Sequence, residues 1–368
     1  MRITWIVNHR NMSGGVRVIA IYAEKLQERG HDVTIISRPR PVPLLRRRIK
    51  SFVLGRGWPV NPNYLPSHLD HIKVKHQIID SGARPIADRD CPDADVVIAT
   101  WWETAYWTND LSPQKGAKAY FVQDFGANDA QPMDKLAETW NMPMHKIVIS
   151  SYIRDLVKQY VPANEPLPLV GNSVDLEIFR SPVRGKQAVP TVGTMYSTEP
   201  FKRLDLCLKA VEIARKTLPD LQLLVFGPSN LSKEYPLPRD TILHQNVPDD
   251  RLKEIYNQCD AWLFGPDKEG YGLPILEAMA CRTPVIATPA GAAPELLEPG
   301  GGLIVPHGDS EGMAKAILQI CSMPDRDWRA MSDKAYSTVA SYSWDQATDL
   351  FEVALRQAVA RFGKGPGH

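Results

Sequence analysis

The sequence predicts an α/β protein with two doubly wound, Rossmann-like domains that face each other across a cleft. The first observation is the order strand, glycine loop, helix, strand over residues 3–37. The second is that this order restarts at residue 191, after a polar, proline-bearing stretch. The third is the length of 368 residues, which is long for one domain and comfortable for two. Ligands of such sheets bind beyond the carboxyl ends of the strands, so we expect the site in the cleft.

In the N-terminal half, "ITWIV" (3–7) is a β-rich run and "NHRNMSGG" (8–15) a polar loop. The next fifteen residues, "VRVIAIYAEKLQERG", have helical spacing and end at Gly30, a good C-cap. Further strands are expected at residues 31–37, 94–100, 118–123 and 145–150, and a helix at 151–160. We therefore predict an N-terminal domain over 1–172 and a linker over 173–190.

In the C-terminal half, strands are expected at residues 191–195, 221–227, 260–265 and 283–288. Helices are expected at residues 203–217, 250–258 and 309–321, with another opened by Pro274. These elements predict a second domain over 191–343. A last helix near 344–361 lies past this repeat, and we expect residues 344–368 to pack back on the first domain and end in a tail.

Composition is that of a globular protein, with 43% apolar and 23% charged residues. The net charge of +1 gives no global reason to expect a nucleic-acid partner. The five cysteines are odd in number and scattered, which is typical of buried free thiols in a reducing compartment. The opening "MRITWIV" is too short for a signal peptide, and no stretch approaches the ~18 apolar residues of a membrane span. We expect a cytoplasmic protein.

The segment "EGYGLPILEAM" (269–279) predicts a binding site. Pro274 suits the first turn of a helix, and the residues before it offer no side-chain oxygen as a cap. The free N–H groups of this helix start favour a phosphate. Glu269 and Glu277 would flank the phosphate, where sugar hydroxyls can donate to them. A nucleotide sugar supplies both groups; the alternative is a solvated helix start with two surface glutamates.

The segment "EGYGLPILEAMACRTPVIAT", followed by "GAAPELLEPGGGLIVPHGD", resembles the E-x7-E region of retaining glycosyltransferases of family 4, which have the GT-B fold. "NSVDLEIF" (172–179) is similar to the N-G-V-D segment that joins the domains of that family, and "SGG" (13–15) to its glycine loop. "SYSWDQATDLF" (341–351) resembles its closing helix. The resemblance covers most of the chain and implies a GT-B fold.

This resemblance implies roles for individual residues. Glu269 would contact hydroxyls of the donor sugar, Glu277 the ribose, and Lys202 the leaving diphosphate. Lys202, Glu269 and Asp124 form the expected catalytic set. Gly14 and Gly15 would close over the diphosphate, and Gly227 and Val247 would lie beside the nucleobase. The full set of expected donor-binding residues is Gly14, Gly15, Thr194, Arg203, Gly227, Val247, Gly270, Tyr271, Gly272, Leu273 and Glu277.

Two positions depart from the family pattern. Thr194 stands where the family often has an arginine, and the neighbouring Arg203 is the candidate to supply that charge. Gln123 stands where many members carry a histidine before Asp124. A glutamine cannot act as a general acid or base as a histidine would at this position. His9 is either a spatial substitute or a plain polar loop residue.

The resemblance implies a metal-independent, retaining transfer of a hexose from a nucleoside-diphosphate sugar to a glycan or lipid-linked acceptor. No cofactor is expected, and cell-envelope polysaccharide assembly fits this activity. A glycosidase is a poor fit, because its two carboxylates must straddle the scissile bond. The alternatives are a sugar-nucleotide epimerase or phosphorylase of the same fold, or a catalytically inactive sugar-nucleotide-binding scaffold.

Two metal-like patterns have simpler explanations. "DAD" (93–95) has the D-x-D form of metal-dependent transferases but precedes a strand, at the end opposite a ligand edge, where a turn is expected. "HLDH" (68–71) lies in an irregular polar stretch. We therefore predict no metal site.

Two further segments concern the acceptor. "TWWETAYW" (100–107) brings together Trp101, Trp102 and Trp107, which either stack on an acceptor sugar or pack in the core. With His9 and Gln123 they are the acceptor-side candidates. Residues 38–56 hold seven Arg and Lys and no acid. This stretch is a solvated loop, a patch for an anionic membrane surface or lipid-diphosphate acceptor, or a nucleic-acid arm. The second alternative predicts peripheral contact with the inner face of the cell membrane.

Overall fold

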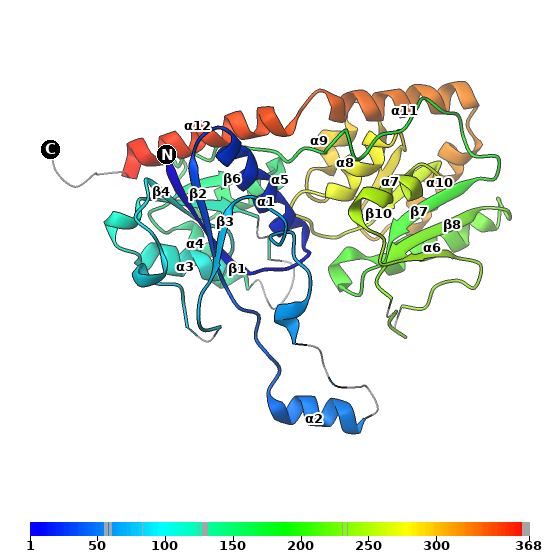
Figure 1. The fold of residues 1–368 in the computed structure, drawn as a ribbon. Helices are drawn as coiled ribbons and strands as arrows, with labels where there is room; N and C mark the ends of the chain where they lie inside the picture. The colour runs from blue at the N-terminus through cyan, green and yellow to red at the C-terminus, as the bar shows by residue number, and fades with distance from the viewer. Residues whose placement is uncertain are drawn as a thin grey trace.

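The computed structural model describes residues 1–54, 58, 61–82, 84–123, 125–126, 132–229, 231–233 and 235–362. These residues form two domains, each with a six-stranded parallel sheet between helices (Figure 1). The strand order is β3-β2-β1-β4-β5-β6 in one sheet and β12-β11-β10-β7-β8-β9 in the other, which is the same doubly wound order twice. The predicted fold class is confirmed.

The N-terminal sheet forms because short runs rich in Val and Ile are buried on both faces, as parallel strands require. Its central strand β1 pairs in register with both neighbours, so that Trp5 lies opposite Ile35 and Ile98. The strands are β1 (Arg2–His9), β2 (Asp32–Arg38), β3 (Lys75–Ile78), β4 (Val96–Ala99), β5 (Ala117–Val122) and β6 (His145–Val148). The helices are α1 (Gly14–Glu28), α2 (Leu45–Val53), α3 (Trp102–Asp110), α4 (Met133–Trp140) and α5 (Ser151–Lys158).

The C-terminal sheet separates two packed layers in the same way. Along β10, Ala261 and Leu263 pack with α6 and α10, whereas Trp262 and Phe264 belong to the layer of α7 and α8. The strands are β7 (Thr191–Met195), β8 (Gln222–Gly227), β9 (Ile242–Gln245), β10 (Ala261–Phe264), β11 (Val285–Ala287) and β12 (Gly302–Ile304). The helices are α6 (Leu204–Arg215), α7 (Leu252–Tyr256), α8 (Leu273–Ala280), α9 (Ala293–Leu297), α10 (Ser310–Ser322) and α11 (Asp325–Ala340).

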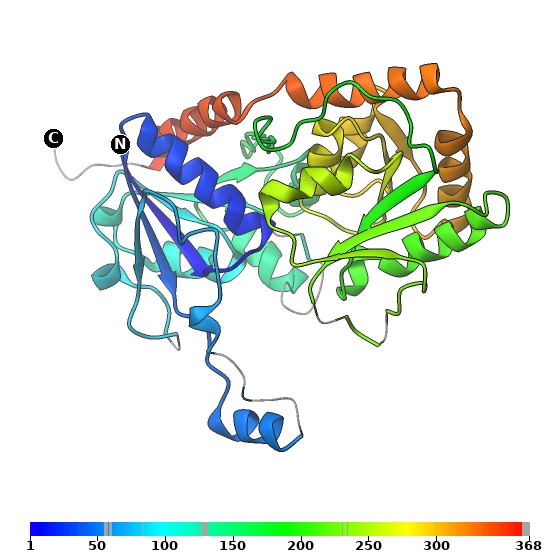
Figure 2. The same cartoon turned by 45° about the vertical axis from the view of Figure 1, so that its right-hand side comes forward.

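The last helix, α12 (Trp344–Phe362), crosses from the C-terminal domain to the N-terminal one (Figure 2). It packs on β4, β5, β6 and α1. The ring of Phe351 stacks on Trp5 at 5.4 Å and on Tyr22 at 4.6 Å between centroids. Lys25 of α1 pairs with Asp345 at 2.7 Å. Helix α12 is therefore part of the core of the first domain.

Helix α2 stands away from both sheets (Figures 1 and 2). None of its residues, all of which are described, is buried. Its apolar residues Leu45, Ile49, Phe52 and Val53 recur at helical spacing and are exposed. The basic stretch that the sequence analysis left open is thus an amphipathic helix in its central part; Arg56, at its end, lies outside the described residues.

Two general features complete the fold. All five cysteines are free and buried. Across the described stretches, we find no helix with the length and apolar character that crossing a membrane demands.

Candidate functional site

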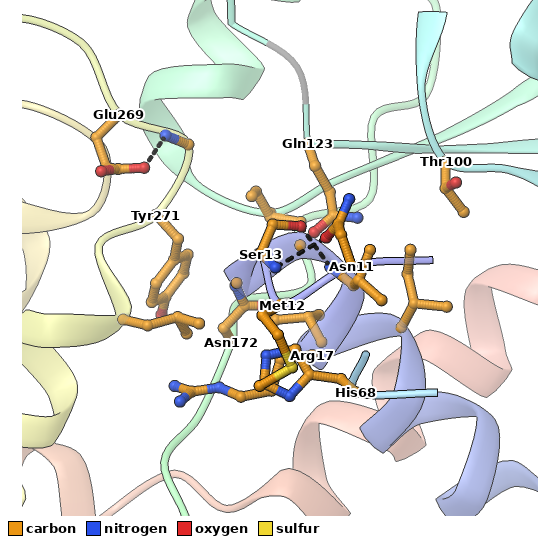
Figure 3. A pocket seen from close by; sticks show the side chains of 18 of the residues that line it. Asn11, Met12, Ser13, Arg17, His68, Thr100, Gln123, Asn172, Glu269 and Tyr271 are labelled. Carbon is orange, nitrogen blue, oxygen red and sulfur yellow. Dashed lines mark hydrogen bonds between the residues drawn. The ribbon is translucent and has the colours of Figure 1, made fainter. Parts of the chain in front are cut away.

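A pocket of about 960 Å³ lies between the domains, where the carboxyl ends of both sheets meet (Figure 3). Ligands of doubly wound sheets bind at this edge. The ends of β1, β4, β5 and β6 line one wall, and the ends of β7 and β8 with the segment after β10 line the other. The sequence-predicted residues that line it are His9, Gly14, Gly15, Trp101, Trp102, Gln123, Lys202, Glu269, Gly270, Tyr271, Gly272, Leu273 and Glu277.

The bend at residues 269–273 presents a helix start to the pocket. Gly272 occupies the N-cap of α8 with a φ of +105°, a conformation that glycine adopts at little cost, and no side chain caps the helix. The carbonyl of Gly270 accepts from Ser150 Oγ at 2.8 Å, and that of Tyr271 from the Ala292 N–H at 2.8 Å. The bend is thus anchored through its carbonyls, while the positive end of α8 faces the pocket.

Glu269 and Lys202 form an ion pair beside this helix start. Lys202 ends the 3₁₀ helix η4 (Pro200–Lys202), and both side chains are largely buried. The second oxygen of Glu269 accepts the N–H of Gly270 at 3.0 Å (Figure 3). Both oxygens of the Glu269 carboxylate therefore have a partner, and the Lys202 cation lines the same pocket.

Glu277, on α8, is only 3% exposed, and both of its oxygens have partners. Oε2 accepts from the hydroxyl of Tyr256 at 2.7 Å, and Oε1 pairs with the guanidinium of Arg17 from the other domain. Arg17 also lies 3.3 Å from Asp249. Burial acts to lower the pKa of Arg17, but the carboxylates of Glu277 and Asp249 raise it overall. Burial, and then Glu277, raises the pKa of Tyr256.

The N-terminal wall opposite is the start of α1. Ser13 caps the helix by accepting the Val16 N–H at 3.4 Å, and its own N–H donates to Asn11 Oδ1 at 2.8 Å (Figure 3). Gly14 and Gly15 therefore belong to the first helical turn and not to the predicted loop. A Cβ on Gly14 would lie 3.1 Å from Leu273 Cδ1, so the missing side chain permits the close approach of the two domains.

The acceptor-side candidates divide into two groups. His9, Trp101, Trp102 and Gln123 line the pocket, whereas Trp107 does not: the guanidinium of Arg38 lies 4.2 Å from the centre of its ring. Burial, and then the charge of Arg38, lowers the pKa of His9. His9 Nδ1 is buried without a hydrogen-bond partner among the described residues. The expected catalytic residue Asp124 lies outside the described residues.

Glu103 is a lining carboxylate that the sequence analysis did not single out. It accepts from the amide of Asn8 and lies 3.7 Å from Arg38, which donates to Asn8 Oδ1 at 2.6 Å. This cluster links the ends of β1, β2 and α3 at the rim of the pocket. Glu103 is the one lining carboxylate that the described residues of the N-terminal domain contribute, and Arg38 partly neutralises it.

Four predicted donor residues do not line the pocket. Thr194 is buried in β7, where its hydroxyl donates to the Leu263 carbonyl at 3.1 Å. Arg203 also lies outside the lining, and its guanidinium donates to Asp205 and Asp267 at 3.0 to 3.1 Å. Those carboxylates, Asp205 first, raise its pKa. Gly227 and Val247 also lie outside the lining.

The structure adds site residues that sequence reasoning missed. Arg17, Asp249, His68 and Asn172 line the pocket, and Tyr256 supports Glu277. Asn172 lies in the segment singled out as the domain joint, and its Oδ1 is buried without a hydrogen-bond partner among the described residues. The signal for Arg17 was its place two residues after Gly15, at the end of the same helical turn. Nothing in the sequence linked it to the helix that carries Glu277.

Neither metal-like pattern forms a cation site in the described chain. Asp95 pairs with Arg2 at 2.9 Å and Asp93 with Lys115 at 2.9 Å, at the amino end of β4. In "HLDH", His68 lines the pocket while Asp70 pairs with Arg10. No group of three or more His, Cys, Asp or Glu is placed to hold a metal among the residues that the structure describes.

The comparisons with known proteins agree with this geometry. Residues 178–338, less than half of the chain, match the family model of glycosyl transferases group 1. The chain is 28% identical over 232 residues to a D-inositol 3-phosphate glycosyltransferase of Saccharomonospora viridis, covering 56% of this chain and 54% of that protein. It is 32% identical over 103 residues to the O-antigen chain mannosyltransferase B of Escherichia coli, covering 28% and 26%. The chain thus spans about half the length of the first curated relatives that it matches.

Solved structures resemble the whole chain. Sucrose-phosphate synthase from Thermosynechococcus elongatus has a TM-score of 0.70 at 17% identity, covering 98% of this chain and 99% of that one. HepE of Anabaena, solved in complex with UDP and glucose, has a TM-score of 0.72 at 15% identity, covering 97% and 100%. These likenesses show the fold alone, and it is the GT-B fold that the resemblance implied.

Proposed function

We propose that this protein is a retaining glycosyltransferase of family 4 that moves a hexose from a nucleoside-diphosphate sugar to a glycan or lipid-linked acceptor. The observation that carries the proposal is the uncapped start of α8 in the interdomain pocket, with the Glu269–Lys202 pair beside it. Helix N–H groups and a lysine suit a diphosphate, and a fixed carboxylate suits sugar hydroxyls. The group 1 match over the same half of the chain supports this assignment.

The proposed mechanism uses positioned charge. Negative charge builds on the diphosphate as the glycosidic bond breaks, and Lys202 and the amides of α8 stabilise it there. Glu269 holds the donor sugar and Glu277 the ribose. Retention follows from attack on the face that the diphosphate leaves, with a phosphate oxygen taking the proton of the acceptor. This mechanism needs neither a protein nucleophile nor a metal.

The acceptor side of the proposal draws on the relatives. These relatives are a D-inositol 3-phosphate glycosyltransferase and an O-antigen chain mannosyltransferase. We therefore propose a role in cell-envelope polysaccharide assembly, in the cytoplasm. Trp101 and Trp102 offer aromatic faces for an acceptor sugar at the pocket.

Helix α2 supports a peripheral membrane contact. Its exposed apolar residues and its cations lie on one helix that stands apart from the sheets (Figure 1). Such a helix lies in a membrane interface with its apolar side in the lipid and its cations at anionic headgroups. The chain around it begins next to Arg38 and returns at His68, both close to the pocket. A membrane-bound α2 would therefore bring the pocket close to a lipid-linked acceptor.

A nucleotide-sugar screen tests the proposal. UDP-, GDP- and dTDP-sugars are tested by thermal shift, and the sugars that stabilise the protein are then incubated with glycan and lipid-linked acceptors. We expect one nucleotide to stabilise the fold and its sugar to be transferred with retention. Conversion of the donor without an acceptor would favour an epimerase, and phosphate-dependent cleavage a phosphorylase. Binding without turnover would favour a scaffold, and no stabilisation by any donor would contradict the proposal.

A further inference from the structure

The charges that line the pocket are mainly negative. Among the described lining residues, the cationic side chains are Arg17 and Lys202, against the carboxylates of Glu103, Asp249, Glu269 and Glu277. A nucleoside diphosphate brings further negative charge, which binds well only against charged or N–H donors. Lys202 is one such donor. With Arg203 tied to its own aspartates, Arg17 is the lining guanidinium left in the described chain for the phosphates.

Arg17 occupies a position where its charge is locally unfavourable. It ends the first turn of α1, a turn without an acidic residue, and the positive end of the helix dipole repels a cation there. The guanidinium extends from α1 toward the C-terminal domain (Figure 3), where Glu277 and Asp249 offset its charge. An anion in the pocket would offset both the guanidinium and the helix dipole.

Arg17 can leave its ion pair with Glu277 only if other donors replace it on that carboxylate. The carboxylate of Glu277 is buried, so losing Arg17 without replacement would be strongly unfavourable. Ribose hydroxyls are suitable replacement donors, because each gives a hydrogen bond to a charged acceptor. On the other side of the bend, Glu269 is likewise paired with a cation, that of Lys202. Each carboxylate expected to bind hydroxyls is therefore paired with a cation suited to phosphate.

We propose that Arg17 binds the diphosphate of the donor, exchanging its contacts with Glu277 and Asp249 for phosphate oxygens while ribose hydroxyls take its place on Glu277. The inference rests on the proposed function and names a binding residue for it. Arg17 then supplies, from the N-terminal domain, the cation that the family pattern has at the position of Thr194. The exchange also couples donor binding to the contact between the domains.

The test compares ligands that differ only in phosphate number. Calorimetry with UDP, GDP and dTDP first identifies the base that the wild type binds, and the nucleoside and monophosphate of that base complete the series. In Arg17→Gln, we expect the affinity for the diphosphate to fall about ten- to a hundredfold, as for a lost charged hydrogen bond. The monophosphate should lose less, and the nucleoside almost nothing. Arg17→Lys should restore part of the diphosphate affinity.

Two further variants make the outcome decisive. Arg29→Gln is the matched control at the other end of α1, where Arg29 pairs with Asp349 outside the pocket, and it should bind the whole series like the wild type. If Arg17→Gln does not fold because Glu277 is left unpaired, the double variant Arg17→Gln/Glu277→Gln is compared with Glu277→Gln alone. The added loss for the diphosphate should persist in that comparison.

Equal losses for the nucleoside and the diphosphate would mean that Arg17 only positions Glu277, and would overturn this inference while leaving the proposed function standing. Unchanged diphosphate binding in Arg17→Gln would overturn it too. A wild type that binds none of the diphosphates would overturn the proposed function and this inference with it.

Discussion

Glu269 is expected to contact the donor sugar and Glu277 the ribose, and the surroundings of the two side chains differ. Glu277 is buried on α8 under Tyr256, whereas Glu269 sits on the bend itself. Glu277→Gln should weaken nucleoside-diphosphate binding about tenfold or more, because a charged acceptor for the ribose is lost. Glu269→Gln should leave nucleotide binding nearly intact and depress sugar transfer. Calorimetry of the diphosphate and transfer rates on the same preparations check both; exchanged results would reverse the ribose and sugar assignments.

A second prediction at this scale concerns acid stability. His145 of β6 is 2% exposed, and its ring nitrogens have no hydrogen-bond partner among the described residues. Burial first, and then the charge of Arg361, lowers its pKa to about 4. Between the ordinary pKa of about 6.5 and this value, the unfolded chain binds a proton that the folded one excludes, so stability is lost as the pH falls.

The test follows urea unfolding from pH 7 to pH 4.5. His145→Leu removes the titrating ring, and it should reduce the loss of stability over this interval by up to about 3 kcal/mol. Little difference is expected in how the two proteins respond to pH above 7. Identical pH profiles for wild type and variant would show that His145 does not control the acid response.

Some features of the candidate site could be predicted from the sequence, and others depend on contacts between distant residues. The bend at residues 269–273 could be predicted because glycine and proline determine its backbone locally. The partner of Glu277 could not, because Arg17 lies 260 positions away along the chain and meets it only when the domains face each other. Arg203 neighbours Lys202 in sequence, yet it has a left-handed backbone, pairs with two aspartates and lies outside the pocket lining, so the place of its side chain also depended on contacts that the sequence did not reveal.

At the scale of elements, periodicity predicts what is buried. The Val- and Ile-rich strands and the helices α1, α6, α10 and α12 follow the expected pattern within a few residues. The strands β3, β9 and β12 were missed: β3 and β9 are polar and largely exposed edge strands, and β12 is an edge strand of three residues. Helix α2 was not predicted as a helix, and none of its residues is buried, so its apolar periodicity marks an exposed surface and not a core.

The same exposure makes α2 testable as a membrane contact. Each cation near an anionic surface contributes about 1 kcal/mol, and not all of them can face the lipid, so binding should be partial and salt-sensitive. Replacing Arg46, Arg47, Arg48 and Lys50 with Ser should abolish sedimentation with anionic liposomes and spare transfer to a soluble acceptor. The measurement is co-sedimentation at low and high salt.

A charge-matched control separates α2 from net charge. Replacing four exposed cations elsewhere, Lys158, Arg180, Arg251 and Arg326, changes the net charge equally and should leave liposome binding intact. If the wild type ignores anionic liposomes even at low salt, α2 is a solvated surface helix.

At the scale of the whole molecule, the two domains are joined in two ways. Across the cleft, polar contacts connect them: Arg17 with Glu277, Lys268 with the Gly126 carbonyl at 3.0 Å, and Ser151 with Glu295 at 2.8 Å. Behind the cleft, α12 packs into the N-terminal core after α11 has covered the C-terminal domain (Figure 2). An aromatic pair, Phe125 with Phe201 at 6.0 Å between ring centroids, also crosses the cleft. The domains are therefore held together by contacts across the cleft and by α12 behind it.

This division gives a stability prediction for α12. Phe351 is fully buried against Trp5 and Tyr22, so Phe351→Ala should lower the free energy of unfolding of the N-terminal domain by about 3–5 kcal/mol. Leu350, the preceding residue of the same helix, is exposed, and Leu350→Ala should change it by no more than about 0.5 kcal/mol. Calorimetry should show the transition of one domain moving to lower temperature in Phe351→Ala while the other stays in place. Equal, small effects of the two substitutions would mean that α12 contributes little to the core of the first domain and that the cleft contacts alone unite the molecule.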